Sequence, residues 1–124
     1  MEKEALVNAA LLSLNDLPWE PFGGKTIGIF RKPLSAAKFG SGFKAVLTLA
    51  KPGGVFPDHV DPYTHIFFIL EGQGEAMVEG QSLPLKTGGA LTVPAGRIHA
   101  YRNPGPADLL LITINIYEGV EGSP

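Results

Sequence analysis

The chain has 124 residues, of which 44% are hydrophobic and 18% charged, and its formal net charge is −2. We expect one globular domain, since this length leaves little room for a second, and no nucleic-acid partner, since positive charge is not in excess. Without cysteine, disulfides, thiolate nucleophiles and sulfur-rich zinc sites are excluded, so any metal ligand must be a nitrogen or oxygen atom.

The N-terminal segment 1–24 is predicted to be an arm that leads into the domain. Residues 3–14 are mostly apolar and could form one short helix or an arm packed on a neighbouring subunit, a choice that periodicity does not decide. Asn8, Ser13 and Asn15 interrupt the apolar run, which fits neither a signal peptide nor a membrane span. We therefore expect a cytoplasmic protein without a membrane partner.

Short runs rich in β-branched and aromatic residues follow, separated by turns of glycine and proline. The predicted strands are 26–31, 43–50, 65–70, 75–79, 90–93, 100–103 and 109–117. No helix-length amphipathic stretch interrupts them, so the predicted fold class is all-β: an antiparallel barrel or jelly roll whose interior is lined by alternate side chains. The barrel would span residues 25–118, with a C-terminal tail at 119–124.

Both faces of the last predicted strand, 109–117, carry apolar side chains. A strand that is covered on both sides needs a second layer or another subunit outside it. Together with the apolar N-terminal arm, this predicts a homodimer.

All three histidines of the chain lie between positions 59 and 99. His59 and Asp61 are two residues apart, so on extended backbone their side chains point the same way. A turn could bring His65 back beside them, and His99 would come from a distant strand. Three imidazoles and one carboxylate inside a barrel suit one divalent transition metal ion, Fe, Mn, Ni, Co or Zn, with open positions for water or substrate.

Several of these residues and their neighbours have more than one interpretation. Asp61 could instead be a turn residue before Pro62 whose carboxylate caps backbone amides. Tyr63 and Tyr101 lie close in sequence to the predicted ligands, so we predict that they join Asp61 as candidate catalytic residues in the metal cavity, with core packing as the alternative. Arg97 could anchor a substrate carboxylate or remain a solvated loop residue.

The glycines, prolines and candidate ligands together resemble the two motifs of the cupin superfamily. The first family motif, G-x5-H-x-H-x3-4-E-x6-G, is matched in spacing by Gly53, His59, Asp61, His65 and Gly72. The second, G-x5-P-x-G-x2-H-x3-N, is matched without substitution by Gly88, Pro94, Gly96, His99 and Asn103. The resemblance implies a double-stranded β-helix with a metal site.

Two positions depart from the family pattern, because Asp61 replaces the second histidine and His65 replaces the glutamate. Three histidines and one carboxylate remain, and Asp61 becomes the candidate for the proton transfer that the motif glutamate performs in some cupins. With every histidine committed to metal, the ion would do most of the chemistry.

The resemblance implies a metal-dependent enzyme, such as a dioxygenase, isomerase, decarboxylase or hydration-type enzyme. Its substrate would be a small oxygenated metabolite: a sugar acid, a hydroxy or keto acid, or a catechol-like compound. The alternatives are a non-catalytic module that binds a sugar or another small ligand, and a storage or structural barrel in which the metal is only a staple.

Overall fold

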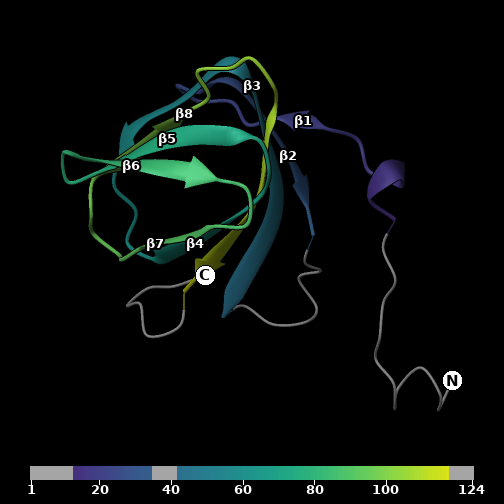
Figure 1. The fold of residues 1–124 in the computed structure, drawn as a ribbon. Coiled ribbons are helices and arrows are strands. Elements are labelled where there is room, and N and C mark those ends of the chain that lie inside the picture. The colour runs from purple at the N-terminus through teal and green to yellow at the C-terminus, as the bar shows by residue number, and fades with distance from the viewer. Residues whose placement is uncertain (1–12, 35–41, 118–124) are drawn as a thin grey trace, which may run out of the picture.

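The computed structural model describes residues 13–34 and 42–117, which form a nearly closed antiparallel barrel (Figure 1). One 3-10 turn, η1 (Leu14–Asp16), precedes the strands. The strands are β1 (Glu20–Pro21), β2 (Ile27–Pro33), β3 (Phe43–His59), β4 (Thr64–Glu71), β5 (Gln73–Val78), β6 (Gln81–Lys86), β7 (Ala90–Val93), β8 (His99–Arg102) and β9 (Leu109–Ile116).

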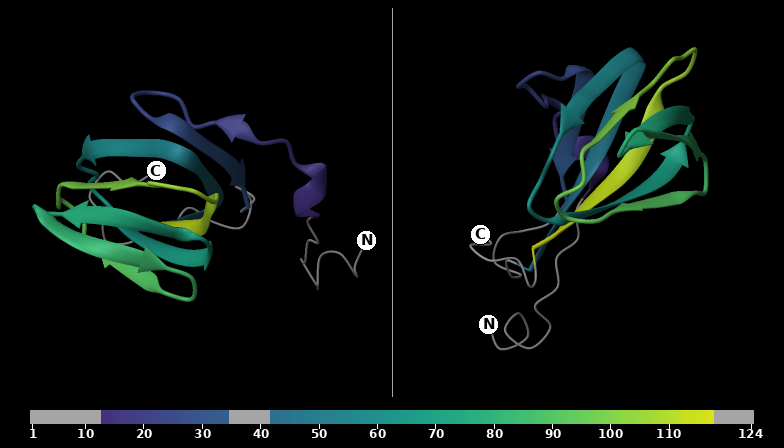
Figure 2. Two further views of the ribbon diagram at one scale, coloured as in Figure 1. Left: turned by 45° about the horizontal axis from the view of Figure 1, so that its top comes forward. Right: turned by 90° about the vertical axis from the view of Figure 1, so that its left-hand side faces the viewer.

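The long strand β3 belongs to both layers of the barrel. The hydrogen-bonded order is β6-β5-β8-β3-β9-β4-β7, with β2 beside β3 and β1 beside β2. The first half of β3 pairs with β2 and β9, whereas its last residues pair with β8. Figure 2 shows the two layers that result, one around β9 and β4 and the other around β5 and β8.

The register of β4 and β9 divides the interior into an apolar and a polar end. Directly paired residues share one face of a sheet. The inward pairs along these two strands are Ile69 with Leu111, Phe67 with Thr113 and His65 with Asn115. Side chains therefore change from apolar to polar towards the beginning of β4, and the buried hydrophobic core occupies the opposite end.

The all-β barrel is the predicted fold class, and it is confirmed, but β3, β6 and the two-residue strand β1 differ from the strand predictions. β3 continues to His59, whereas the Pro52-Gly53-Gly54 sequence predicted a break after residue 50. Gly53 has a φ of +83°, so it turns the strand without ending it, a conformation that glycine adopts at little cost. β6 was not predicted because Ser82 and Pro84 weaken its strand pattern.

The prediction for the N-terminal segment can be compared with the structure only from residue 13 onward, since residues 1–12 lie outside the described part of the chain. Within the described part, the helical element before β1 is the 3-10 turn η1, which begins where the segment 3–14 ends, so the choice between helix and arm stays a prediction. Its Leu14 carbonyl accepts a 2.7 Å hydrogen bond from Lys32 Nζ on β2. No helix in residues 13–34 or 42–117 has the length and apolarity to cross a membrane. The boundaries at 24/25 and 118/119 stay predictions.

Candidate metal centre

Both sequence motifs meet at the polar end of the barrel. His59 ends β3 and is the register partner of His99, which begins β8. The turn after β3 carries Asp61, whose backbone carbonyl accepts a 2.8 Å hydrogen bond from the amide of Gly96. His65, the second residue of β4, points into the same space. The turn of one motif is thus tied to the turn of the other.

The three histidines and Asp61 form one compact cluster, as predicted from their spacing. One ligand atom from each of the four residues lies within 4.8 Å of the others. Asp61 Oδ2 lies 2.7 Å from His65 Nε2, 3.1 Å from His59 Nε2 and 3.9 Å from His99 Nε2. The carboxylate therefore faces the imidazoles, which favours the ligand interpretation of Asp61 over the backbone cap.

Each imidazole is oriented by a hydrogen bond through its other ring nitrogen. His59 Nδ1 donates to the carbonyl of Pro57 and His99 Nδ1 to that of Arg97, both over 2.9 Å. His65 Nδ1 donates to Asn115 Oδ1 over 2.7 Å. Because an oxygen acceptor fixes the proton on Nδ1, the Nε2 lone pairs point towards Asp61, the arrangement usual for metal-binding histidines.

The chemistry of this donor set fits a divalent metal ion. Three Nε2 lone pairs and a carboxylate oxygen cannot satisfy one another, because all four are acceptors when the imidazoles are neutral. His99 Nε2 is buried and has no hydrogen-bond partner, and burial lowers the pKa of His99, which favours its neutral form. A cation among these atoms would satisfy all four, and nitrogen with oxygen ligands suits Fe, Mn, Ni, Co or Zn.

The cluster opens into a cavity of about 210 Å³. Its wall mixes aromatic side chains with polar and charged ones: Phe22, Arg31, Lys44, Val46, Thr48, Phe56, His59, Asp61, Tyr63, His65, Phe67, Tyr101, Thr113, Asn115 and Tyr117. Ligand pockets in proteins commonly measure about 300–1,000 Å³. The cavity therefore suits a small metabolite.

Tyr63 lies in the cavity wall, and its catalytic role stays a prediction. Its ring centroid is 5.0 Å from that of His65 and 4.7 Å from that of Tyr117. Burial, followed by the negative charge of Asp61, raises the pKa of Tyr63 to about 12. A hydrogen bond with Asp61 is a further cause. The phenol keeps its proton near neutral pH and is a hydrogen-bond donor beside the candidate centre.

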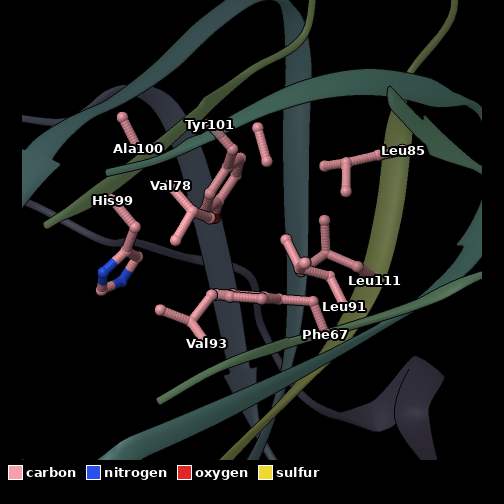
Figure 3. A pocket seen from close by; sticks show the side chains of 10 residues that line it. Phe67, Val78, Leu85, Leu91, Val93, His99, Ala100, Tyr101 and Leu111 are labelled. Atoms are coloured by element: carbon pink, nitrogen blue, oxygen red, sulfur yellow. The ribbon is translucent and has the colours of Figure 1, made fainter. Parts of the chain in front are cut away.

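Tyr101 has one side in the cavity and the other in the hydrophobic core. It is 5% exposed and packs against Phe56 and Phe67 with centroid distances of 5.3 and 5.7 Å. On the core side, Tyr101 and Phe67 border a void of about 10 Å³. Figure 3 shows this void lined by apolar side chains, with the imidazole of His99 at one side. Burial raises the pKa of Tyr101. Core packing accounts for most of its contacts, and a catalytic role stays a prediction.

Sequence reasoning missed three residues of this site. Arg31 and Asn115 lie on β2 and β9, which carry no motif, and Lys44 lies at the start of β3, at the other end from the motif residue His59. Only the strand register brings the three residues to the cavity. Arg97, considered as an anchor for a carboxylate, is not in the cavity wall. Its exposed side chain instead lies 3.9 Å from Glu79.

A family comparison now decides the classification. The family model for the Cupin domain, Cupin_2, matches residues 46–115, more than half of the chain. The chain is a cupin. Both motifs and the whole candidate metal centre lie within the matched segment.

Two curated proteins are similar to parts of this cupin. Polyketide synthase CurC of Streptomyces cyaneus is 30% identical over 73 residues, which are 58% of this chain and 47% of that protein. The 5-nitrosalicylic acid 1,2-dioxygenase of Bradyrhizobium sp. is 36% identical over 67 residues, 54% of this chain and 32% of that protein. These matches thus span at most about half of either relative.

Solved cupin structures share the fold. The polyketide cyclase RemF from Streptomyces resistomycificus superposes with a TM-score of 0.79 over 89% of this chain and 80% of that chain, at 18% identity. A likeness at this identity concerns the barrel and not the reaction.

Proposed function

We propose that this cupin is a metal-dependent enzyme that acts on a small oxygenated metabolite. The observation that carries the proposal is the cluster of three oriented imidazoles and one carboxylate, of which His59, Asp61 and His65 line an open cavity. His59, Asp61, His65 and His99 would hold the ion. A metal ion that only stabilised the fold would not need the adjoining cavity.

A divalent ion at this centre supplies a Lewis acid that polarises a chelating oxygen group and lowers the pKa of bound water. The protein itself would orient the metal ligands and limit the access of water to the substrate. Pro57, Arg97 and Asn115 hold the imidazoles in place through their oxygen acceptors. The aromatic side chains of the cavity would limit water around the substrate, and the Tyr63 phenol would be a hydrogen-bond donor for that substrate.

An aromatic or otherwise planar metabolite is the favoured choice among the substrate classes. Phe22, Phe56, Tyr63 and Tyr117 offer ring faces and edges to the cavity, and aromatic rings associate with one another in offset or edge-to-face contacts. The similarity to a protein named as a dioxygenase of a nitrosalicylic acid supports the same choice. Dioxygenation is accordingly the first reaction to test, before isomerisation, decarboxylation and hydration.

The test begins with metal binding. The protein is stripped with a chelator, reloaded separately with Fe(II), Mn(II), Co(II), Ni(II) or Zn(II), and assayed for bound metal and for turnover of aromatic and aliphatic hydroxy acids. We expect one ion per chain and turnover with at least one ion. Failure to bind any of the five ions would refute the proposal, and binding of an acid without turnover by any loaded form would favour the non-catalytic module.

Two aspartates give a matched pair of variants for this test. Asp61→Asn removes the charge that faces the imidazoles, whereas Asp58→Asn makes the same change on an exposed side chain just before His59. We expect Asp61→Asn to weaken metal binding at least about tenfold, since a ligand charge is lost, and Asp58→Asn to leave it within about twofold.

A further inference from the structure

Two cationic side chains line the cavity although neither belongs to the candidate metal centre. Arg31 comes from β2 and Lys44 from the first part of β3. Arg31 is half-buried and Lys44 is exposed. One positive charge therefore lies within the cavity wall and the other at its mouth.

The register of the sheet explains why both residues belong to the inner face. Arg31 is paired with Thr48, and Lys44 is paired with Asn115, which is itself paired with His65. Thr48, Asn115 and His65 all line the cavity. Their pairing partners share this face, because side chains of directly paired residues lie on the same side of a sheet.

Neither cation is neutralised by the described part of the protein. In residues 13–34 and 42–117 the ion pairs formed by lysine and arginine involve Lys51, Arg97 and Arg102 only. Arg31 Nε is buried without a hydrogen-bond partner, and the guanidinium carbon lies 4.9 Å from the centroid of the Phe22 ring. A buried donor without an acceptor is costly in a folded protein. The free donor therefore indicates a group that arrives with the ligand.

The charge of the cavity indicates which group that is. Its charged side chains are two cations, Arg31 and Lys44, and one carboxylate, Asp61, which already faces the three histidines. A divalent ion adds further positive charge. A site of this sign concentrates anions, and an arginine fork matches the two oxygens of a carboxylate.

The geometry points to a carboxylate-binding subsite in which Arg31 holds the acid group of a small organic anion and Lys44 attracts that anion to the cavity mouth. This inference rests on the proposed function, because it takes the cavity as the substrate site. It names the substrate class as carboxylic acids and assigns specificity to residues outside both sequence motifs. The aromatic lining accommodates the planar body of the acid.

The experiment compares acids with their neutral amides. Salicylate and salicylamide, and 2-hydroxyisobutyrate and its amide, are titrated calorimetrically into the Zn(II)-loaded and the metal-free wild-type protein. The same titrations are made with Arg31→Gln, Arg31→Lys, Lys44→Gln and, as the matched control, Arg102→Gln, whose exposed side chain pairs with Glu75 outside the cavity. Bound zinc is measured separately for every variant.

We expect at least one acid to bind the wild type about tenfold more tightly than its amide. Arg31→Gln should weaken that acid about tenfold or more, because a charge-assisted hydrogen bond is lost, and should change the amide within about twofold. Lys44→Gln should weaken the acid less, by an amount that decreases with added salt. The zinc content of every variant should equal that of the wild type, and Arg102→Gln should bind the acid and the amide as the wild type does.

Three results would overturn the inference: neither acid binds more tightly than its amide, Arg31→Gln binds the acid like the wild type, or Arg31→Gln weakens acid and amide equally. If Arg31→Gln does not fold, Arg31→Lys replaces it in the test. A threefold or greater loss of affinity for the acid, with the affinity for the amide unchanged, would support the inference, and an unchanged affinity for the acid would refute it. A protein that binds no metal but discriminates acid from amide through Arg31 would refute the proposed function and retain this subsite.

Discussion

Asp61 and its neighbours show how single residues define the candidate centre. The aspartate side chain is shorter than the glutamate common in cupin motifs, and it leaves the turn after β3, where its backbone carbonyl is already bonded to Gly96. Its Oδ2 atom consequently lies within 3.9 Å of all three Nε2 atoms. Exchange of aspartate and histidine between the two motif positions is therefore compatible with one compact donor set.

Asn115 provides a prediction at the residue scale. Replacing it with alanine removes the 2.7 Å acceptor of His65 Nδ1, so His65 loses its fixed orientation. We expect Asn115→Ala to reduce metal affinity by about 10- to 100-fold, the usual effect of removing such a partner. A competition titration with a chromogenic chelator measures this. Asn115→Asp keeps an oxygen acceptor and should bind metal more tightly than Asn115→Ala; equal affinity of all three proteins would contradict the role of Asn115.

The sequence predicted the four candidate ligands but not the residues that support them. His59, Asp61, His65 and His99 stand in motifs with fixed spacing, and two of them also share a face through alternation. Asn115 and Arg31 have no comparable local signal. Their places depend on which strands pair and in which register, and pairing between strands far apart in the chain is not visible in either segment alone.

At the scale of elements, the turn between β4 and β5 is held by close packing. Gly72 has a φ of +87°, and a Cβ atom there would lie 2.2 Å from the carbonyl oxygen of Asp108. Gly80, in the turn between β5 and β6, has a similar φ of +79° but has no atom within 4 Å of such a Cβ. A substitution at Gly80 therefore introduces backbone strain alone, whereas the same substitution at Gly72 adds steric overlap.

We expect Gly80→Ala to lower the free energy of unfolding by about 1–2 kcal/mol, the cost of a left-handed conformation for a residue with a side chain. Gly72→Ala pays the same cost and also displaces the backbone at Asp108, so its loss should be about 2–5 kcal/mol. Urea unfolding of both variants and the wild type gives the comparison. Equal losses would show that the overlap at Gly72 is relieved freely.

The strand pattern of the sequence identified most elements because alternation and glycine turns are local signals. It failed at β3, where Pro52 and Gly53 are typical of a turn but lie inside a strand of 17 residues. Pairing with β2, β9 and β8 along its length holds this strand through the bend. Tertiary pairing thus overrides the local preference.

At the scale of the whole molecule, the ion would contribute to stability because its ligands come from β3, β8, β4 and the turn between β3 and β4. An ion present at a hundred times its dissociation constant stabilises the folded state by about 2.7 kcal/mol. We therefore expect a chelator to lower the midpoint of thermal unfolding by about 10 °C. The chelator should lower the unfolding midpoint of Asp58→Asn by the same amount and that of His59→Ala hardly at all. A wild-type midpoint that the chelator leaves unchanged would contradict metal binding in the folded protein.

The predicted homodimer and the cytoplasmic location stay predictions. Large apolar side chains are exposed on the described surface, among them Phe43, Phe68 and Leu70, and a second copy could cover them. Light scattering over a range of concentrations tests the dimer.

The division of the barrel interior into an apolar and a polar end has a consequence for local opening. We expect amide protons at the apolar end, near Leu109 and Leu111, which are 0% exposed, to exchange only when the whole barrel unfolds. At the polar end, His59, His65 and His99 lie at or next to strand termini, where the candidate metal centre joins β3, β4 and β8. Hydrogen exchange should therefore be slow and insensitive to metal at the apolar end and metal-dependent at the end that carries the candidate metal centre, so that local opening is confined to that end.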